Sequence, residues 1–117
     1  EEALEFTRVN VWRAARVACA ARHVDWRAMP DDLGRFDRVV ASDVLYERPY
    51  AALVARAIAG TLARGGEAWV TDPGRLAAPE FVERARALGL AVDEPELHDV
   101  DGYGARQTIR LYRLRRR

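Results

Sequence analysis

Apolar and polar residues follow two different periods along this chain, and the period decides each predicted element. The stretch from Tyr50 to Ala63 carries apolar residues at helical spacing, follows Pro49 and stops at Gly65-Gly66. Arg38 to Ser42 is a short apolar run typical of a buried strand. The sequence therefore predicts helices at 1–15, 50–63 and 79–88, and strands at 17–24, 38–42, 67–71, 90–97 and 108–114.

The order of these elements predicts the fold class. Strands and helices alternate through the middle of the chain, which favours an α/β fold with a parallel sheet. Two strands then follow one another around Gly102 and Gly104, which favours an antiparallel hairpin at the end. The sequence shows no internal repeat and no linker, so we expect residues 1–117 to belong to a single domain.

The amino-acid composition excludes several classes of function and of catalytic group. Half of the 117 residues are hydrophobic and the formal net charge is +1, so neither disorder nor field-driven binding to nucleic acid is implied. The chain has no lysine, which excludes a Schiff base, a P-loop lysine and a lysine general base within it. The single Cys19 cannot form an intramolecular disulfide and suits a reducing cytoplasm. No apolar run approaches about 18 residues, so no membrane span or signal peptide is predicted here.

The beginning of the chain carries its own expectation. It opens with Glu1 inside a predicted helix, and its only methionine is Met29. We therefore expect these residues to be a fragment, or a processed product, of a longer protein.

The segment FDRVVASDVLYERPY, from Phe36 to Tyr50, is the most informative part of the chain. Its apolar strand ends on Ser42 and Asp43, and Tyr46 follows three residues after the carboxylate. In an open parallel sheet, the carboxyl ends of the strands face the ligand crevice. The segment resembles the motif IV region of the class I S-adenosylmethionine-dependent methyltransferases. Its Asp-Val-Leu-Tyr resembles the D-x-x-Y element of family 16, which includes many protein-lysine methyltransferases.

The resemblance covers essentially the whole chain and implies a partial Rossmann-like methyltransferase sheet ending in an antiparallel hairpin. In that family the strand order is third, second, first, fourth, fifth, seventh, sixth. The strands here would be the third to the seventh, so the first two strands and the glycine-rich cofactor loop would precede Glu1.

The resemblance also implies N-methyl transfer from S-adenosylmethionine, with a lysine ε-amine as the favoured acceptor. Asp43 would orient the amine, and Tyr46 would wall the acceptor channel. Asp25 and Trp26 would line the adenine pocket, and Ser42 would approach the cofactor.

Each of these residues also has a purely structural interpretation. Asp43 could cap the helix that follows, with Tyr46 packed beneath it, and Trp26 could plug the edge of the sheet. Asp72, at a predicted strand end, could face the acceptor channel, but a turn aspartate is the simpler interpretation. For the function of the whole chain, the alternative is a non-catalytic interaction module or a degenerate methyltransferase. For the methyl acceptor, the alternative is a small amine or a nicotinamide-like ring.

The remaining polar residues define the expected partners. No metal site is predicted, because His23, His98 and Cys19 lack metal-ligand spacing. The acidic stretch 93–101 is either a solvated edge or a surface that attracts a basic protein substrate. The final arginines favour a solvated terminus over a nucleic-acid patch. Without the first two strands, residues 39–41 would form an open apolar edge, so self-association of the chain is expected.

Overall fold

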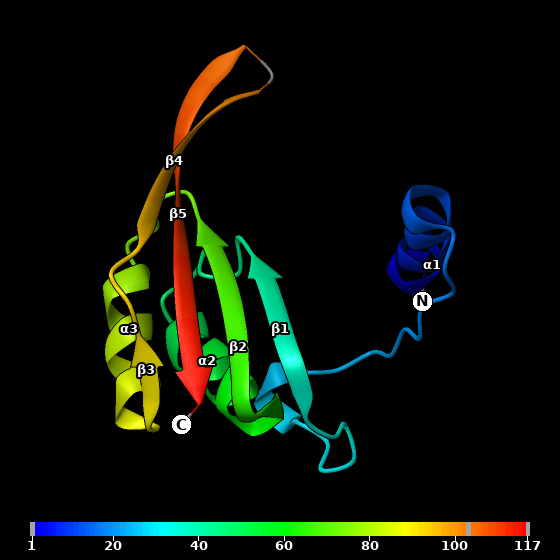
Figure 1. The fold of residues 1–117 in the computed structure, drawn as a ribbon, viewed down its shortest axis with the longest axis horizontal. Coiled ribbons are helices and arrows are strands. Elements are labelled where there is room, and N and C mark those ends of the chain that lie inside the picture. The colour runs from blue at the N-terminus through cyan, green and yellow to red at the C-terminus, as the bar shows by residue number, and fades with distance from the viewer. Residues whose placement is uncertain (1, 103, 117) are drawn as a thin grey trace. The chain divides into compact units, whose positions relative to one another are not determined.

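The computed structural model describes residues 2–102 and 104–116. Its residues form two compact units, Glu1–Pro30 and Asp31–Arg117, and each unit is described by itself (Figure 1).

The first unit contains one α-helix and one short 3₁₀ helix. The helix α1 (Glu2–Ala15) confirms the prediction for 1–15 and has acidic side chains in its first turn, where the helix dipole favours them. The 3₁₀ helix η1 spans Trp26–Ala28. The strand predicted at 17–24 is wrong, since these residues have no regular secondary structure. A strand needs a neighbour to pair its backbone groups, and none of the described strands pairs with this segment.

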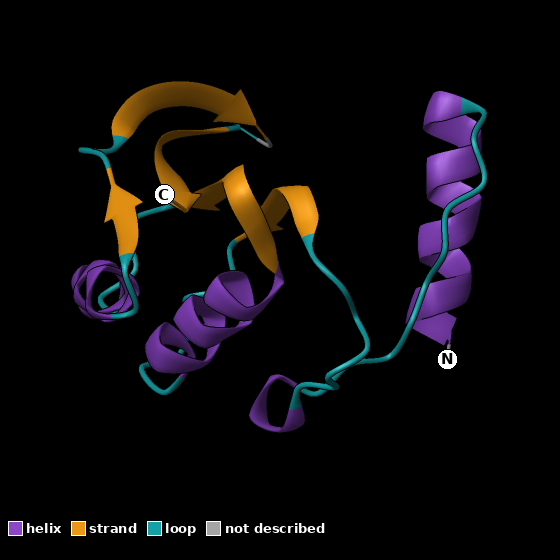
Figure 2. Cartoon of the chain, turned by 60° about the horizontal axis from the view of Figure 1, so that its bottom comes forward, coloured by secondary structure: helices purple, strands orange, loops and turns teal. Residues whose placement is uncertain are grey.

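The second unit is a five-stranded sheet covered on one face by two helices. Its elements are β1 (Phe36–Ser42), α2 (Tyr50–Thr61), β2 (Leu62–Asp72), α3 (Ala78–Ala87), β3 (Leu90–Val92), β4 (Glu96–Gly102) and β5 (Ala105–Arg116). The order is β1-β2-β5-β3, with β4 also paired to β5. β1 and β2 are parallel and the pairings with β5 are antiparallel, which confirms the predicted fold class. Both helices lie on the same side of the sheet (Figure 2).

The core lies between this face and the two helices. Along β2, Ala68, Val70 and Asp72 are buried, while the alternate residue Trp69 lies on the opposite face. Phe81 of α3 is fully buried and packs edge-on against Tyr112 of β5, with ring centroids 6.4 Å apart. Burying such a side chain contributes about 1.5–3 kcal/mol, so the helices and the sheet stabilise each other.

The face without helices has a different character. The indole of Trp69 lies between two guanidinium groups, those of Arg38 at 4.5 Å and Arg113 at 5.2 Å from its ring centroid. Its Nε1 donates a short hydrogen bond to Glu67, whose carboxylate also meets both arginines. These contacts hold the indole on the face of the sheet opposite to α2 and α3.

Two element boundaries differ from the prediction. Helix α2 ends at Thr61 and β2 begins at once with Leu62, so Gly65-Gly66 lies inside the strand and does not end the helix. The pairing of β1 with β2 is irregular here, between Phe36 and Arg38. A Cβ on Gly66 would lie 2.8 Å from the carbonyl oxygen of Ala63, so this irregularity needs glycine.

The second difference lies in the strand predicted at 90–97, which is two strands, β3 and β4. Pro95 lies between them and has no N–H for a sheet ladder. β4 then pairs with the first half of β5 in a hairpin that extends beyond the end of β2 (Figure 1). Every described residue of β4 is exposed.

Candidate functional site

The candidate site forms where β1 and β2 end, because the carboxyl ends of neighbouring parallel strands meet at one edge of a sheet. Ser42 pairs with Thr71 in the sheet register, and the Thr71 hydroxyl donates to the Ser42 hydroxyl at 3.0 Å. The backbone N–H of Asp43 donates to the carbonyl of Thr71 at 2.9 Å. The strand pairing therefore continues up to Asp43 and fixes where its side chain leaves the sheet.

Asp43 has an unusual backbone. Its φ of +49° lies in the left-handed region, which aspartate tolerates better than most residues but which still costs energy. Such strain persists only where the surroundings hold it, and it concentrates at functional sites. The left-handed backbone of Asp43 comes immediately after β1 ends at Ser42.

Arg75 holds the carboxylate of Asp43. Its Nε and Nη2 donate to Oδ1 and Oδ2, each at 3.0 Å, in a bidentate pair whose two side chains are about half exposed. The hydrogen bonds from Arg75 lower the pKa of Asp43, against a smaller opposing effect of burial. The hydrogen bond to Asp43 likewise raises the pKa of Arg75, with a smaller effect of the Asp72 charge. At neutral pH, Asp43 is therefore ionised and acts as a hydrogen-bond acceptor and a weak base.

The helix-capping interpretation of Asp43 is wrong. The N-cap position of α2 is Pro49, and no side chain caps that helix. Tyr46 does not pack beneath Asp43 either, since 55% of its surface is exposed. Its ring lies 5.0 Å from the ring of Tyr50, tilted by 56°.

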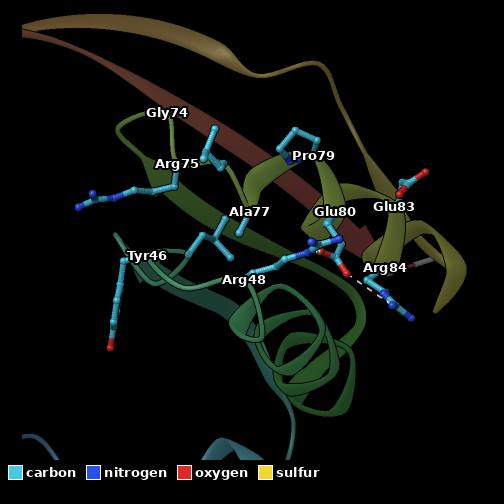
Figure 3. Close-up of a pocket in the computed structure, with 11 residues that line it drawn as sticks. Tyr46, Arg48, Gly74, Arg75, Ala77, Pro79, Glu80, Glu83 and Arg84 are labelled. Carbon is cyan, nitrogen blue, oxygen red and sulfur yellow. Dashed lines mark hydrogen bonds and ion pairs between the residues drawn. The ribbon is translucent and has the colours of Figure 1, made fainter.

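Tyr46 lines an open groove of about 960 Å³ beside the strand ends. Figure 3 shows Tyr46 and Arg75 toward one end of the groove and Glu80 and Arg84 toward the other. The buried Leu45 contributes to the groove lining, and Leu76 is almost fully exposed there. The remaining lining residues are Arg48, Gly74, Ala77, Pro79 and Glu83. Glu80 is shared between Arg48 at 3.4 Å and Arg84 at 3.5 Å, so much of the charge in the groove is internally paired.

Asp72 is a turn aspartate and not a lining residue of the groove. Its side chain is fully buried, and Oδ2 accepts from the backbone N–H groups of Gly74 and Arg75, both at 2.8 Å. The interpretation in which it faces an acceptor channel is wrong, because no part of it reaches the surface.

Asp25 and Trp26 belong to the first unit. The Asp25 carboxylate caps η1 by accepting from the backbone N–H of Arg27 at 2.9 Å, and the Arg27 guanidinium also donates to it. These hydrogen bonds lower the pKa of Asp25. Trp26 is half-buried. The part that both residues play in an adenine pocket stays a prediction.

The acidic stretch is mostly paired with β5. Glu96 meets Arg113 at 3.1 Å and Asp93 meets Arg115 at 2.7 Å. Asp99 accepts from the Thr108 hydroxyl at 2.8 Å. These contacts favour the interpretation of a solvated edge, since the negative charges have partners in their own sheet.

Within 2–102 and 104–116, no group of three or more histidine, cysteine or acidic side chains is placed to hold a metal ion. No helix in these ranges is both long enough and apolar enough to span a membrane.

Comparison with known proteins defines the fold. No protein-family model and no curated protein sequence matches the chain. The structure has the fold of a partial class I methyltransferase sheet. It is similar to the crystal structure of N-methyltransferase NodS from Bradyrhizobium japonicum WM9 in complex with S-adenosyl-L-homocysteine, with a TM-score of 0.57 and 15% sequence identity. The match covers 88% of this chain and 58% of that chain, so these residues span little more than half of that structure.

Sequence reasoning missed Arg75 as a site residue. The sequence contains a signal for Arg75, because Asp43 and Arg75 each come shortly after an apolar strand, and one predicted helix lies between these two strands. Two parallel strands that end on polar residues place those residues at one edge. The pairing of Asp43 with Arg75 across 32 residues follows from that topology.

Proposed function

We propose that this chain is part of an S-adenosylmethionine-dependent methyltransferase that methylates a nitrogen atom. The observation that carries the proposal is Asp43, a strained and ionised aspartate at the end of β1, beside the open groove that Tyr46 lines. The methyltransferase fold supports it, since the neighbouring N-methyltransferase was crystallised with S-adenosyl-L-homocysteine. Family 16 remains the proposed family, on the resemblance of Asp43-Val44-Leu45-Tyr46.

The residues at the strand ends fit a cofactor of this kind. Ser42 is exposed, small and held by Thr71, so the carboxyl end of β1 offers an uncrowded polar surface. When bound, S-adenosylmethionine supplies an electrophilic methyl group on a sulfonium sulfur. Asp25 and Trp26 remain the proposed adenine-pocket residues on the family resemblance alone, with the Trp26 indole as a flat apolar face for the adenine.

Asp43 would orient the acceptor nitrogen. A carboxylate has about four lone-pair positions, so the two hydrogen bonds from Arg75 leave room for a third from the acceptor N–H. Since the pKa of Asp43 is lowered, it is a poor proton acceptor, and the nitrogen must lose its proton to solvent. Positioning and exclusion of water would then provide most of the rate enhancement, with Tyr46 as a wall and a π face for positive charge.

The proposed acceptor is a lysine ε-amine of a protein, and the alternatives are a small amine or a nicotinamide-like ring. The lysine proposal rests on the family 16 resemblance. The paired charges of the groove and of the acidic stretch give it no additional support, because they offer little uncompensated negative charge to a basic segment.

A non-catalytic module or degenerate methyltransferase is the second candidate. The observation that favours it is that Arg75 already occupies both oxygens of Asp43.

The two candidates separate in one experiment on the complete natural polypeptide that contains these residues. It is incubated with methyl-labelled S-adenosylmethionine and with a lysine peptide, a small amine or nicotinamide as acceptor. A methyltransferase labels at least one acceptor and binds S-adenosyl-L-homocysteine in calorimetry. A folded polypeptide that does neither is a non-catalytic module.

A further inference from the structure

Asp72 is a fully buried carboxylate at the end of β2, in the row that also holds Ala68 and Val70. Only one of its oxygens is satisfied. Oδ2 accepts the two backbone hydrogen bonds from Gly74 and Arg75, whereas Oδ1 is buried without a hydrogen-bond partner. Removing a carboxylate from water is unfavourable unless its contacts compensate. Here those contacts all belong to the turn that precedes α3.

That turn has little freedom. Gly74 has a φ of +102°, and a Cβ at this position would lie 2.5 Å from the Arg110 guanidinium. Arg110 is the partner of Asp72 in the register of β2 with β5. The turn is therefore held by the Asp72 side chain, and it runs beside the end of the Arg110 side chain. Its path fixes the backbone of Arg75, whose guanidinium then meets Asp43.

We propose that Asp72 is a positioning residue that, through the turn it holds, aims the Arg75 guanidinium at the carboxylate of Asp43. Asp72 does not line the groove and acts only through Arg75. The buried carboxylate of Asp72 accepts from the backbone N–H of Arg75, and the guanidinium of Arg75 donates to the exposed carboxylate of Asp43. The meaning of this arrangement for catalysis rests on the proposed methyltransferase function. The arrangement itself is measurable without any reaction.

The test is the titration of the Asp43 carboxyl carbon by NMR in the full chain. Asp43 titrates below the ordinary value of an exposed aspartate, because Arg75 binds it. Asp72→Asn keeps an acceptor oxygen for the turn and should leave this titration unchanged. Asp72→Ala removes both backbone hydrogen bonds and should return the Asp43 pKa to its ordinary value, as should Arg75→Gln. In the Arg75→Gln background, Asp72→Ala should cause no further shift.

Three results would overturn the proposal. One is an unchanged Asp43 titration in folded Asp72→Ala. Another is a shift of the Asp43 pKa by Asp72→Ala that is equally large in the wild-type and in the Arg75→Gln background. The third is a return to the ordinary pKa in folded Asp72→Asn, which decides the matter even where Asp72→Ala does not fold.

Activity gives an independent readout in the complete natural polypeptide. Asp72→Ala should lower kcat at least tenfold with cofactor affinity unchanged, and Asp72→Asn should restore most of it. A wild-type polypeptide without methyl transfer would refute the proposed function and leave the titration result standing.

Discussion

Asp43 carries backbone strain and an ion pair at the same position. The strain costs about 1–3 kcal/mol by analogy with other left-handed residues, and an exposed ion pair returns at most about 1 kcal/mol. Stability alone therefore does not account for an aspartate here. The same imbalance applies to Asp72, which is buried with one oxygen unsatisfied. Asp43 is better explained by the acceptor that it would orient, and Asp72 by the turn that positions Arg75.

The Asp43–Arg75 pair predicts a specific dependence of stability on pH. Because the pKa of Asp43 is lower in the folded chain, the pair stabilises the fold above the unfolded pKa, about 3.9. The contribution disappears as the pH falls through the lower folded value. Arg75→Gln should therefore reduce the free energy of unfolding at pH 7 by a small amount, as for an exposed ion pair.

Urea unfolding at several pH values checks this prediction. The difference between wild type and Arg75→Gln should vanish at a pH low enough to protonate Asp43 in both the folded and the unfolded state. A difference that stays constant down to that pH would mean that Arg75 stabilises the fold by packing and not by its pair with Asp43.

At the scale of elements, Gly66 tests why β2 begins so early. Gly66→Ala should destabilise the chain by about 1–3 kcal/mol, because its Cβ would meet two backbone oxygens, those of Ala63 at 2.8 Å and Asp37 at 3.0 Å. Gly60 is the matched control. It lies in α2 with no atom within 4 Å of an added Cβ, so Gly60→Ala should stabilise by about 0.5–1 kcal/mol. Thermal unfolding that shifts both variants in the same direction would contradict this account of the irregular pairing.

Periodicity predicted the elements whose stability is local. Both helices of the second unit, and the strand around Val70, have patterns that match their burial. The strand around Val39 forms where it was predicted, but the prediction that it is buried is wrong, because none of its residues is buried. The failures concern long-range pairing. The strand predicted at 17–24 has no partner among the described strands. The single strand predicted at 90–97 did not take account of Pro95, which lies between β3 and β4.

The candidate site was predictable to the same extent. The sequence located Ser42 and Asp43 at a strand end and Tyr46 after it. Arg75 meets Asp43 through a contact that the sheet topology creates, because these two residues lie 32 positions apart. The side chain that holds the turn is buried, and no sequence pattern separates it from an ordinary turn aspartate.

At the scale of the whole molecule, β1 is an open edge. Among the described strands, β1 pairs only with β2, and 69% of the Val40 surface is exposed. An uncovered edge of this kind pairs with other chains. The 117-residue chain should therefore form concentration-dependent oligomers in light scattering, and Val40→Lys should reduce them. A stable wild-type monomer would contradict this prediction.

Amide exchange should follow the same organisation. Residues before Phe36 should exchange fast, because the described part of α1 has no buried residue and an isolated helix of that length is marginal. Residues 67–71 should exchange slowly, since they pair with β1 on one side and with β5 on the other. The exposed hairpin of β4 with the first half of β5 should exchange faster than this core. Protected amides in 17–24 would mean that this segment packs against another part of the chain, and that the assignment of the missing strands is wrong.

The central claim is that methyl transfer takes place at the end of β1. Its most direct test compares turnover with S-adenosyl-L-homocysteine affinity in the complete natural polypeptide, for wild type, Asp43→Asn, Tyr46→Phe and Trp26→Ala. Asp43→Asn and Tyr46→Phe should lower kcat, Asp43→Asn by about 10²-fold or more, with cofactor affinity nearly unchanged. Trp26→Ala should instead weaken cofactor binding by about 1–3 kcal/mol, the range of stacking on a base. Unchanged kcat in folded Asp43→Asn would contradict the account.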